Sequence, residues 1–496
     1  MRLRIASRQS DLARVQAVHV ARLVQAQLGA QGRTLEVEFH ASESLGDRNL
    51  ADPLWKMPEK GVFTADLSAG LRAGRYDVVV HSWKDLPLEA DEAVLGCPVR
   101  EDARDLVLFR SASLGAWQHG GTLAVLSSSP RRERNLAGFL REFLPHPPAQ
   151  VLFLPVRGNV PTRIRKLLQG EGGAHALVVA RAAIQRLLHV PDPAFAPVAA
   201  RLREDLSQVE SVVAPLSINP PAPAQGALAL EVRPADASTR ALLAPIVDPA
   251  STADVREERR TLGRFGGGCH QRIGVSCTTT PAGRIEVLRG VTEAGEVLDR
   301  RTLVRAHAPA APSASGLWSA ALAGVTLFDR ERLHVPPGRL EALPGWYVSH
   351  PEALPEVPAS RPSWCAGLST WKWMTARGHW VRGCDDGLGE SGPAGYVKLA
   401  HAGAPGIEEG LATYRLVPRP VADAWTAWRL EGKTHFFWRS HSQFRLVTCA
   451  FPRLLGAEHA CGPGSSARLI ARDLAGHGGR VDLFLEEDAW RTHHGA

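Results

Sequence analysis

The feature that most constrains the fold is an alternation of short apolar runs with helix-like segments through the first two hundred residues. The apolar runs predict strands at residues 2–6, 77–80, 123–126, 151–154 and 176–179. After the first run, Ser10 is placed to cap a helix whose apolar face ends at Gly29. Strands that alternate with helices are typical of an α/β fold built on a mostly parallel sheet.

Length and composition set broad limits on the kind of protein. With 496 residues and 44% hydrophobic content, the chain is long enough for several domains. No apolar run is long enough to span a bilayer, and the first ten residues, MRLRIASRQS, do not resemble a signal peptide. The seven cysteines are scattered without a C-x-x-C pair, which favours reduced thiols over disulfides or a zinc site. We therefore expect a cytoplasmic protein without a metal.

The charge pattern favours an anionic small molecule as ligand. There are 58 basic and 51 acidic residues, a formal charge of +7. The basic residues stand singly or in pairs between apolar runs, not in the aromatic-interleaved stripes typical of nucleic-acid binders. We expect a pocket for a carboxylated or phosphorylated ligand.

Basic and hydroxyl side chains follow four of the expected strands. Ligands of open α/β sheets gather at the carboxyl ends of strands, and arginine binds both oxygens of a carboxylate. One such group alone is more often a solvated helix start, but four at the same topological point predict a polyanion-binding cleft. The groups are Arg8 with Ser10, Lys84 with Asp85, Ser127 and Ser128 with Arg131 and Arg132, and Arg157 with Arg163.

Two further residues are candidates for chemistry. Asp85 is the acidic member of a basic neighbourhood, where a carboxylate could hold N–H groups and stabilise a developing cation. A lone aspartate in a turn is more commonly a turn former or cap. Cys269 follows three glycines, which leave its side chain accessible, although a buried cysteine beside a turn is the commoner case.

Eight ordered motifs resemble those of the hydroxymethylbilane synthase (porphobilinogen deaminase) family across roughly residues 1–310. They are IASRQSDLARVQA, PLWKMPEKGVF, VVVHSWKDLP, REDARD, SSSPRRERNL, VRGNVPTR, PAQGALALEVR and GGGCHQRIG. The resemblance implies two lobes like those of periplasmic binding proteins and a small α+β domain that bears the cofactor. The implied ranges are 1–107 plus 208–232 for the first lobe, 108–207 for the second and 233–324 for the cofactor domain.

The resemblance also implies roles for individual residues. Cys269 would carry a dipyrromethane cofactor through a thioether bond. Asp85 would assist the loss of ammonia from porphobilinogen and stabilise the azafulvenium cation that results. The residues implied to hold the cofactor are Asp85, Lys84, Ser128, Arg131 and Arg132; those implied to hold substrate are Arg8, Ser10, Arg157, Arg163 and Arg186, with Lys56, Lys60 and Phe63 on the loop that covers the cleft in this family. The expected protein is a monomeric transferase that binds no nucleic acid and no membrane.

The chain departs from the family pattern at a few backbone positions. Pro58 and Glu59 replace a usual glycine pair, Leu126 and Ala224 replace single glycines, and His175 replaces an aspartate. None of these changes removes a catalytic group. They put loop dynamics and local backbone geometry in question.

Residues 325–496 resemble a second family, uroporphyrinogen-III synthase, in fewer motifs. These are WCAGLSTWKWMTARGHWVRGCDDGLGE, ATYRLVP, HFFWRSHSQFRLV and HACGPGSSARLIARDL. The last motif implies that Gly462, Ser465 and Ser466 contact substrate carboxylates at a helix N-terminus, where free amides bind anions. We expect a further α/β region, shorter than the two-lobed family form and lacking its early strands. It is an active cyclase, a trimmed one or a docking relic.

Two other classes of protein remain as alternatives. The predicted lobes are also those of solute-binding proteins, although Cys269 and Asp85 in their motifs argue against that class. A nucleic-acid-binding regulator is suggested only by the net charge.

Overall fold

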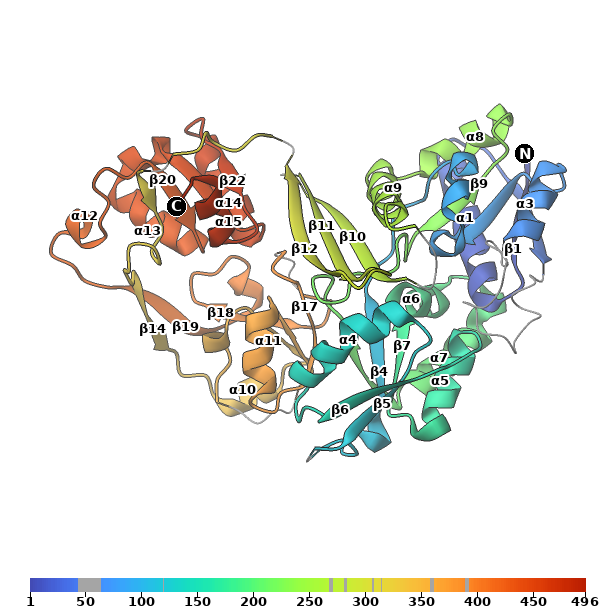
Figure 1. The fold of residues 1–496 in the computed structure, drawn as a ribbon, viewed down its shortest axis with the longest axis horizontal. Helices are drawn as coiled ribbons and strands as arrows, with labels where there is room; N and C mark the ends of the chain where they lie inside the picture. Colours follow the sequence, from blue (N-terminus) through green and yellow to red (C-terminus); the bar gives the residue numbers. More distant parts are fainter. Residues whose placement is uncertain are drawn as a thin grey trace. The chain divides into compact units, whose positions relative to one another are not determined.

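A computed structural model describes residues 1–42, 64–118, 120–266, 271–280, 283–305, 307–313, 315–356, 361–388 and 392–496 (Figure 1). The chain divides into two compact units. The first contains Met1–Glu142, Pro147–Thr279 and Glu286–Arg300, and the second contains Phe143–His146, Thr280–Ile285 and Arg301–Ala496. Within the described ranges, no helix has the length and apolar character needed to cross a membrane.

The first sheet has the strand order β2-β1-β3-β9. Its strands are β1 (Arg2–Arg8), β2 (Glu36–Ser42), β3 (Val78–Ser82) and β9 (Leu228–Glu231), and only β9 is antiparallel to its neighbour. Its helices are α1 (Asp11–Gly29), α3 (Ala65–Arg72) and α8 (Ala237–Leu243). As predicted, the Ser10 side chain caps α1 by accepting from the Ala13 amide, and the helix ends at Gly29.

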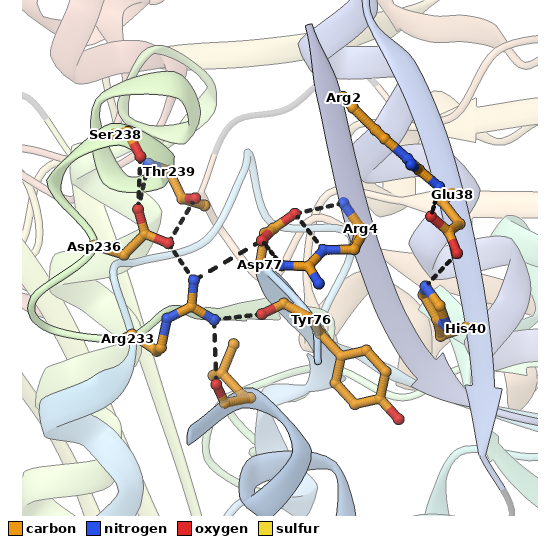
Figure 2. Close-up of polar contacts among 11 residues, drawn as sticks. Arg2, Arg4, Glu38, His40, Tyr76, Asp77, Arg233, Asp236, Ser238 and Thr239 are labelled. Atoms are coloured by element: carbon orange, nitrogen blue, oxygen red, sulfur yellow. Dashed lines mark hydrogen bonds and ion pairs between the residues drawn. The ribbon is translucent and has the colours of Figure 1, made fainter. Parts of the chain in front are cut away.

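An ion-pair network fixes the other end of this sheet, away from the carboxyl ends of β1 and β3 (Figure 2). Asp77, directly before β3, accepts from Arg4 Nη2 at 2.7 Å and from the Arg4 amide at 2.8 Å. Burial opposes ionisation of Asp77, but Arg4 and Arg233 outweigh it and hold its pKa below the ordinary value. Asp236 caps α8 through the Thr239 amide and also pairs with Arg233. The network joins two strands to the segment that leads into α8.

The second sheet has the order β6-β5-β7-β4-β8. Its strands are β4 (Asp105–Arg110), β5 (Thr122–Leu126), β6 (Gln150–Leu154), β7 (Ala176–Ala180) and β8 (Val209–Val213), of which β5, β6 and β7 run parallel and β4 runs antiparallel to β7 and β8. Its helices are α4 (Pro130–Glu142), α5 (Val160–Leu168), α6 (Arg181–His189) and α7 (Ala196–Leu206). The predicted strands and the mixed α/β class are confirmed here.

A third, three-stranded sheet contains β10 (Arg272–Thr280), β11 (Gly283–Val291) and β12 (Val297–Arg305). Helix α9 (Pro249–Gly263) packs against it through Leu262, which joins Ile273, Val275, Leu288 and Leu298 in one core. This is the small α+β arrangement expected near the cofactor-bearing loop.

Strand pairing and core packing move four of the predicted domain boundaries. Residues 105–107 and 208–213 had been placed in the first lobe, but β4 and β8 pair in the second sheet. Helix α8 had been placed in the cofactor domain, yet Leu243 packs in the core of the first sheet with Leu3 and Val20. Strand β13 (Leu317–Trp318) had also been placed there, but it pairs with β20 of the second unit. Each boundary is set by contacts between residues far apart in the sequence, which a local hydrophobic pattern does not indicate.

The second unit contains two sheets. The larger has the order β14-β19-β18-β15-β16-β17 and the smaller the order β13-β20-β21-β22. The larger is made of β14 (Phe328–Arg332), β15 (Trp346–Val348), β16 (Ser363–Cys365), β17 (Val381–Cys384), β18 (Val397–His401) and β19 (Leu411–Pro418). The smaller adds β20 (His435–Trp438), β21 (Glu458–Cys461) and β22 (Val481–Leu483) to β13. Among the described residues, the strand pairings of both sheets are parallel except that of β14 with β19.

The expectation that this region lacks its early strands is wrong. Strands β15 and β16 have three residues each, too short for a periodic pattern to reveal. The helices are α10 (Pro337–Glu341), α11 (Leu368–Thr375), α12 (Ala424–Ala427), α13 (His441–Ala450), α14 (Ser465–Ala475) and α15 (Glu487–His493). The unit therefore has two sheet-based lobes, not half of a cleft.

Candidate active site

Lys84 and Asp85 lie where β3 ends. The strand runs into a short 3-10 turn, Trp83–Asp85, and Trp83 is fully buried in a cluster with Leu86 and Cys97. This anchor fixes the turn that carries the two charged residues. Arg8 is the last residue of the neighbouring parallel strand β1, and its Nη1 lies 4.0 Å from Asp85 Oδ2. The sheet topology thus joins two of the groups predicted from sequence.

The other two groups meet at the carboxyl ends of β5 and β6. The Ser128 hydroxyl accepts from the Val156 amide at 2.8 Å and donates to the Val156 carbonyl at 2.9 Å, which ties the two turns together. Asn159 caps α5, the helix that carries Arg163. Arg157 lies in the turn between them.

Charge interactions at Arg163 join three of the four groups, and the Arg8–Asp85 distance joins the fourth. Burial and then the positive charges of Arg132 and Arg157 lower the pKa of the Arg163 guanidinium to about 10, while Asp85 opposes the shift. Charges influence one another in this way only at short range in a weakly screened environment. A surplus of cations around one carboxylate is the electrostatic arrangement that suits a ligand with several carboxylates.

A buried aspartate, which the sequence analysis missed, organises this neighbourhood. Asp105, at the start of β4, is fully buried. Its oxygens accept from Arg131 Nη2 at 2.9 Å, Arg132 Nη2 at 2.6 Å and Nε at 3.0 Å, Asn219 Nδ2 at 2.9 Å and Gln225 Nε2 at 2.8 Å. Burial opposes ionisation, but the two arginines hold the pKa of Asp105 far below its ordinary value. The one sequence feature that could have indicated a role for Asp105 is its position at the end of the REDARD motif.

The Asp105 network reaches the Trp83–Asp85 turn through Gln225. Lys84 Nζ donates to Gln225 Oε1 at 3.2 Å, while Gln225 Nε2 donates to Asp105. Burial lowers the pKa of Lys84, although Asp85 and Asp105 oppose the shift. A polar chain therefore connects the end of β3 to Arg131 and Arg132 on α4.

The remaining predicted arginines differ in their surroundings. Arg131 donates to Asn219 Oδ1, to the Pro220 carbonyl and to Asp105 Oδ2. Arg186, on α6, donates to the Gly226 carbonyl at 2.6 Å, and burial lowers its pKa to about 10. Their assignment to cofactor and substrate stays a prediction.

Four predicted site residues, Cys269, Lys56, Lys60 and Phe63, lie outside the described residues. One of the departures from the family pattern does have a visible consequence. Ala224 has a φ of 66°, in the left-handed region that favours glycine, and its amide donates to Glu258 Oε2 at 2.9 Å. The backbone keeps a glycine-like turn beside Gln225 although the glycine is absent.

The second unit has a pocket of its own, with a volume of about 680 Å³. Its lining follows the carboxyl ends of parallel strands from both sheets: Ser349, Ala366 and Gly387 after β15, β16 and β17, and Arg439, Gly462 and Leu485 after β20, β21 and β22. Ser465 and Ser466, in the first turn of α14, also line it. The three residues singled out in the HACGPGSSARLIARDL motif therefore lie in one pocket.

Comparison with known proteins identifies the family. The family model described as "Porphobilinogen deaminase, dipyromethane cofactor binding domain" matches residues 3–241. The chain is 36% identical over 275 residues to the porphobilinogen deaminase of Roseiflexus castenholzii, covering 55% of this chain and 80% of that protein. It belongs to the porphobilinogen deaminase family.

Other relatives agree. The porphobilinogen deaminases of Thiobacillus denitrificans and Mycobacterium bovis are 36% and 34% identical to this chain over 277 and 304 residues, which cover 55% and 61% of this chain and 79% and 84% of theirs. The family match confirms dipyrromethane as the cofactor. A substrate-binding protein of a polar amino acid transporter from Streptococcus thermophilus overlaps at 13% identity with a TM-score of 0.28, covering 54% of this chain and 88% of that one, too weakly to establish a shared fold.

Proposed function

We propose that the chain is a hydroxymethylbilane synthase that condenses four porphobilinogen units head to tail, with loss of ammonia, on a dipyrromethane primer attached to Cys269. The observation that carries the proposal is the gathering of the four basic groups near Asp85. Arg8 Nη1 lies 4.0 Å from Asp85 Oδ2, Gln225 and Asp105 join Lys84 to Arg132, and the charges of Arg132, Arg157 and Asp85 all act on Arg163. Each added ring brings further carboxylates, so a growing product needs many cations in one place. The described residues fit a polycarboxylated cofactor for the same reason.

In this proposal, the acidic residue acts on positive charge and the basic residues bind carboxylates. Asp85 stabilises the cation left when ammonia departs from porphobilinogen, because a fixed carboxylate needs no reorganisation as positive charge develops. Arg132, Arg157 and Arg163 hold carboxylates of the growing chain, and Asp105 with Gln225 keeps Arg132 and Lys84 in place. When bound, the dipyrromethane supplies the pyrrole carbon to which the first unit is joined. Its holders are Lys84, Ser128, Arg131 and Arg132.

Intact mass and turnover test this proposal. The wild-type protein should carry the added mass of a dipyrromethane, and Cys269→Ser should remove both the mass and the activity, because a hydroxyl is a far poorer nucleophile than a thiolate. Cys449→Ser, at an exposed thiol, is the matched control and should change neither. Asp85→Asn should keep the added mass but lose turnover by orders of magnitude. Full turnover by Cys269→Ser would refute the mechanism.

The alternative, a solute-binding protein, predicts no covalent mass and no release of ammonia. The same two measurements therefore separate the classes. The cytoplasmic location and monomeric state stay predictions.

A second activity is supported by the pocket of the second unit. We infer that this unit closes hydroxymethylbilane to uroporphyrinogen III. The pocket lies at the carboxyl ends of six parallel strands, and Gly462, Ser465 and Ser466 present amides and hydroxyls at the start of α14, a helix end that suits a carboxylate. Closure with inversion of one ring requires mainly that a flexible polycarboxylate be held in one shape.

Product isomers report this activity separately from the first. Hydroxymethylbilane left in solution closes to the symmetrical isomer I, so isomer III requires a cyclase. Porphobilinogen is given to the full-length chain and to a chain that ends near residue 305, before β13 begins. The full chain should give isomer III and the shorter one isomer I on chromatography of the oxidised products. Isomer I from both would leave the second unit a docking or stabilising role.

A further inference from the structure

The basic side chains that line the pocket of the second unit differ in how far the protein compensates their charge. Among the described residues they are Arg301, Lys398, Arg439 and Arg468. Arg439 forms an ion pair at 2.7 Å with Glu487, which lines the same pocket. Arg301 and Lys398, by contrast, have no carboxylate within ion-pair distance in the part of the chain that the structure describes. Their positive charges are therefore available to an anionic ligand.

Arg301 lies close to the start of α14. It is in the part of β12 that groups with the second unit, and its Nη2 donates to the Asp386 carbonyl at 3.3 Å. The next residue, Gly387, also lines the pocket, and a Cβ at Gly464 would lie 3.2 Å from the Gly387 carbonyl oxygen. Gly464 is the N-cap of α14. The guanidinium and the amides at this helix end therefore serve the same part of the pocket.

The Arg301 guanidinium has donors that the protein does not use. Its bond to the Asp386 carbonyl is its single hydrogen bond within the described ranges, and its buried Nε has no acceptor there. Nη1 likewise has no acceptor in that part of the chain. A guanidinium presents several N–H donors in a fixed fork that matches a carboxylate. A ligand carboxylate in the pocket can therefore bind where the protein offers no partner.

Lys398, on β18, is the second cation without an ion-pair partner in the described residues. Its Nζ donates to the Pro405 carbonyl at 2.7 Å, which leaves further N–H donors of the ammonium group for a ligand. Burial lowers the pKa of Lys398, although Glu408 and Asp385 oppose the shift. A ligand carboxylate beside Nζ would also favour the charged form.

The strand that carries Arg301 lies outside residues 325–496, where the resemblance to uroporphyrinogen-III synthase was found. Strand β12 is instead the last strand of the three-stranded sheet. Further along β12, Arg305 Nε donates to the Leu483 carbonyl at 3.3 Å, and its guanidinium lies 4.4 Å from the centre of the Phe484 ring. These contacts fix the end of β12 within the second unit, so Arg301 is held at the pocket by more than its own hydrogen bond.

We propose that Arg301 and Lys398 each bind a carboxylate of the linear tetrapyrrole in this pocket, so that β12 completes the site of the second unit. This inference rests on the proposed cyclase function. A flexible chain that carries carboxylates on every ring is fixed in one shape only when several of them are held at separate points. Arg301 beside the start of α14 and Lys398 on β18 supply two such points. Both are binding residues, because the carboxylates take no part in the bonds that form and break.

The test supplies freshly prepared hydroxymethylbilane to the full-length protein and measures the rate of isomer III formation over a range of concentrations. Arg301→Gln removes the charge and should raise KM about tenfold or more, the loss expected for one hydrogen bond between charged groups. The change in kcat should be less than about threefold, because the contact is made equally before and during the reaction. Lys398→Met should act in the same way. Since free hydroxymethylbilane closes to isomer I, the III-to-I ratio of both variants should fall at low concentration.

Arg305→Gln is the matched control. Arg305 is on the same strand and also donates to a carbonyl group of the second unit, but it is not among the described residues that line the pocket. Its KM should equal that of wild type. Arg301→Lys keeps the charge without the fork of donors, so its KM should lie between those of wild type and Arg301→Gln. Near-ultraviolet circular dichroism checks folding, and porphobilinogen consumption should be the same in every variant.

The outcomes separate the inference from the function on which it rests. If wild type forms isomer III and Arg301→Gln has an unchanged KM, the role of Arg301 is overturned and the cyclase function stands; the same result in Lys398→Met overturns the role of Lys398. If Arg305→Gln raises KM as much as Arg301→Gln, the attachment of β12 explains the effect and carboxylate binding is overturned. If Arg301→Gln does not fold, Arg301→Lys decides by the same criterion. If wild type forms isomer I alone, the cyclase function fails and the inference fails with it.

Discussion

The Asp105 network offers the sharpest test of the physical account of the first unit. Asp105→Asn keeps the size of the side chain and removes its charge. The carboxylate accepts five hydrogen bonds, three of them from Arg131 and Arg132. An amide has one acceptor oxygen and turns its NH₂ group toward other donors. The substitution therefore leaves two buried or half-buried guanidinium groups without their shared counter-charge.

The expected cost follows from burial. Asp105 is 0% exposed and Arg131 is 4% exposed, so solvent cannot replace the lost contacts. Removing one partner of such a buried pair typically costs about 3–5 kcal/mol in the free energy of unfolding. Glu171→Gln is the matched control in the same unit, because Glu171 pairs with Lys166 at 2.9 Å but is 49% exposed. A surface pair of this kind should cost less than about 1 kcal/mol.

Urea unfolding followed by circular dichroism measures both variants, with one transition fitted for each compact unit. The transition of the second unit serves as an internal reference and should not move. Since the pKa of Asp105 is lowered in the folded state, its contribution is fully present above the unfolded pKa of about 3.9 and is lost as the pH falls below it. The difference between wild type and Asp105→Asn should therefore stay constant from pH 7 to about 4.5 and shrink below that. A loss under about 1 kcal/mol at pH 7 would refute the reasoning.

Three further predictions concern other parts of the chain. Arg157→Leu should stall elongation, so that native mass spectra show a different distribution of enzyme-bound intermediates from wild type. An unchanged distribution would show that Arg157 does not hold the growing product. Burial lowers the pKa of His459 to about 4, so the folded state resists protonation of this side chain. The free energy of unfolding should therefore fall by up to ~3 kcal/mol as the pH drops from about 6.5 toward 4. His459→Gln should reduce this pH dependence in a series of unfolding curves. Gly383→Ala should destabilise the second unit by about 1–3 kcal/mol and change its tryptophan fluorescence, because the added Cβ would overlap the Trp364 ring. The control Gly378→Ser adds a side chain in open space, at a φ of 82°, and should leave the fluorescence unchanged.

The parts of the fold that sequence predicted well are those with strong local patterns. Strands β5 and β7 are buried along most or all of their length, so each reads as an unbroken apolar run. Helix α1 carries both a capping serine and an apolar face. By contrast, β8 and β9 follow one another in the chain but pair in different sheets, which no local pattern encodes.

The candidate site was predictable to a similar extent. Parallel strands bring their carboxyl ends together, so Arg8 and Asp85 could be placed side by side from topology. The role of Asp105 could not, because its partners Arg131, Asn219 and Gln225 are 26, 114 and 120 residues away in sequence. In the second unit, the Tyr347 hydroxyl donates to Asp385, which is 38 residues away in sequence. Asp385 directly follows β17, a strand that the sequence pattern does not predict.

The two candidate sites lie at the same topological position, the carboxyl ends of parallel strands. Around Asp85, burial and then the charges of Arg132 and Arg157 lower the pKa of Arg163, and we propose that this site holds anions chiefly through charge. In the pocket of the second unit, Arg439 is already paired with Glu487 at 2.7 Å, and both line the same cavity as the start of α14. The ligand that we propose there would also meet the amides and hydroxyls at the start of α14. In our proposals, strong charge suits the first site because it must retain a growing polyanion through several additions, whereas directional contacts suit the second because it shapes a finished chain once and releases it.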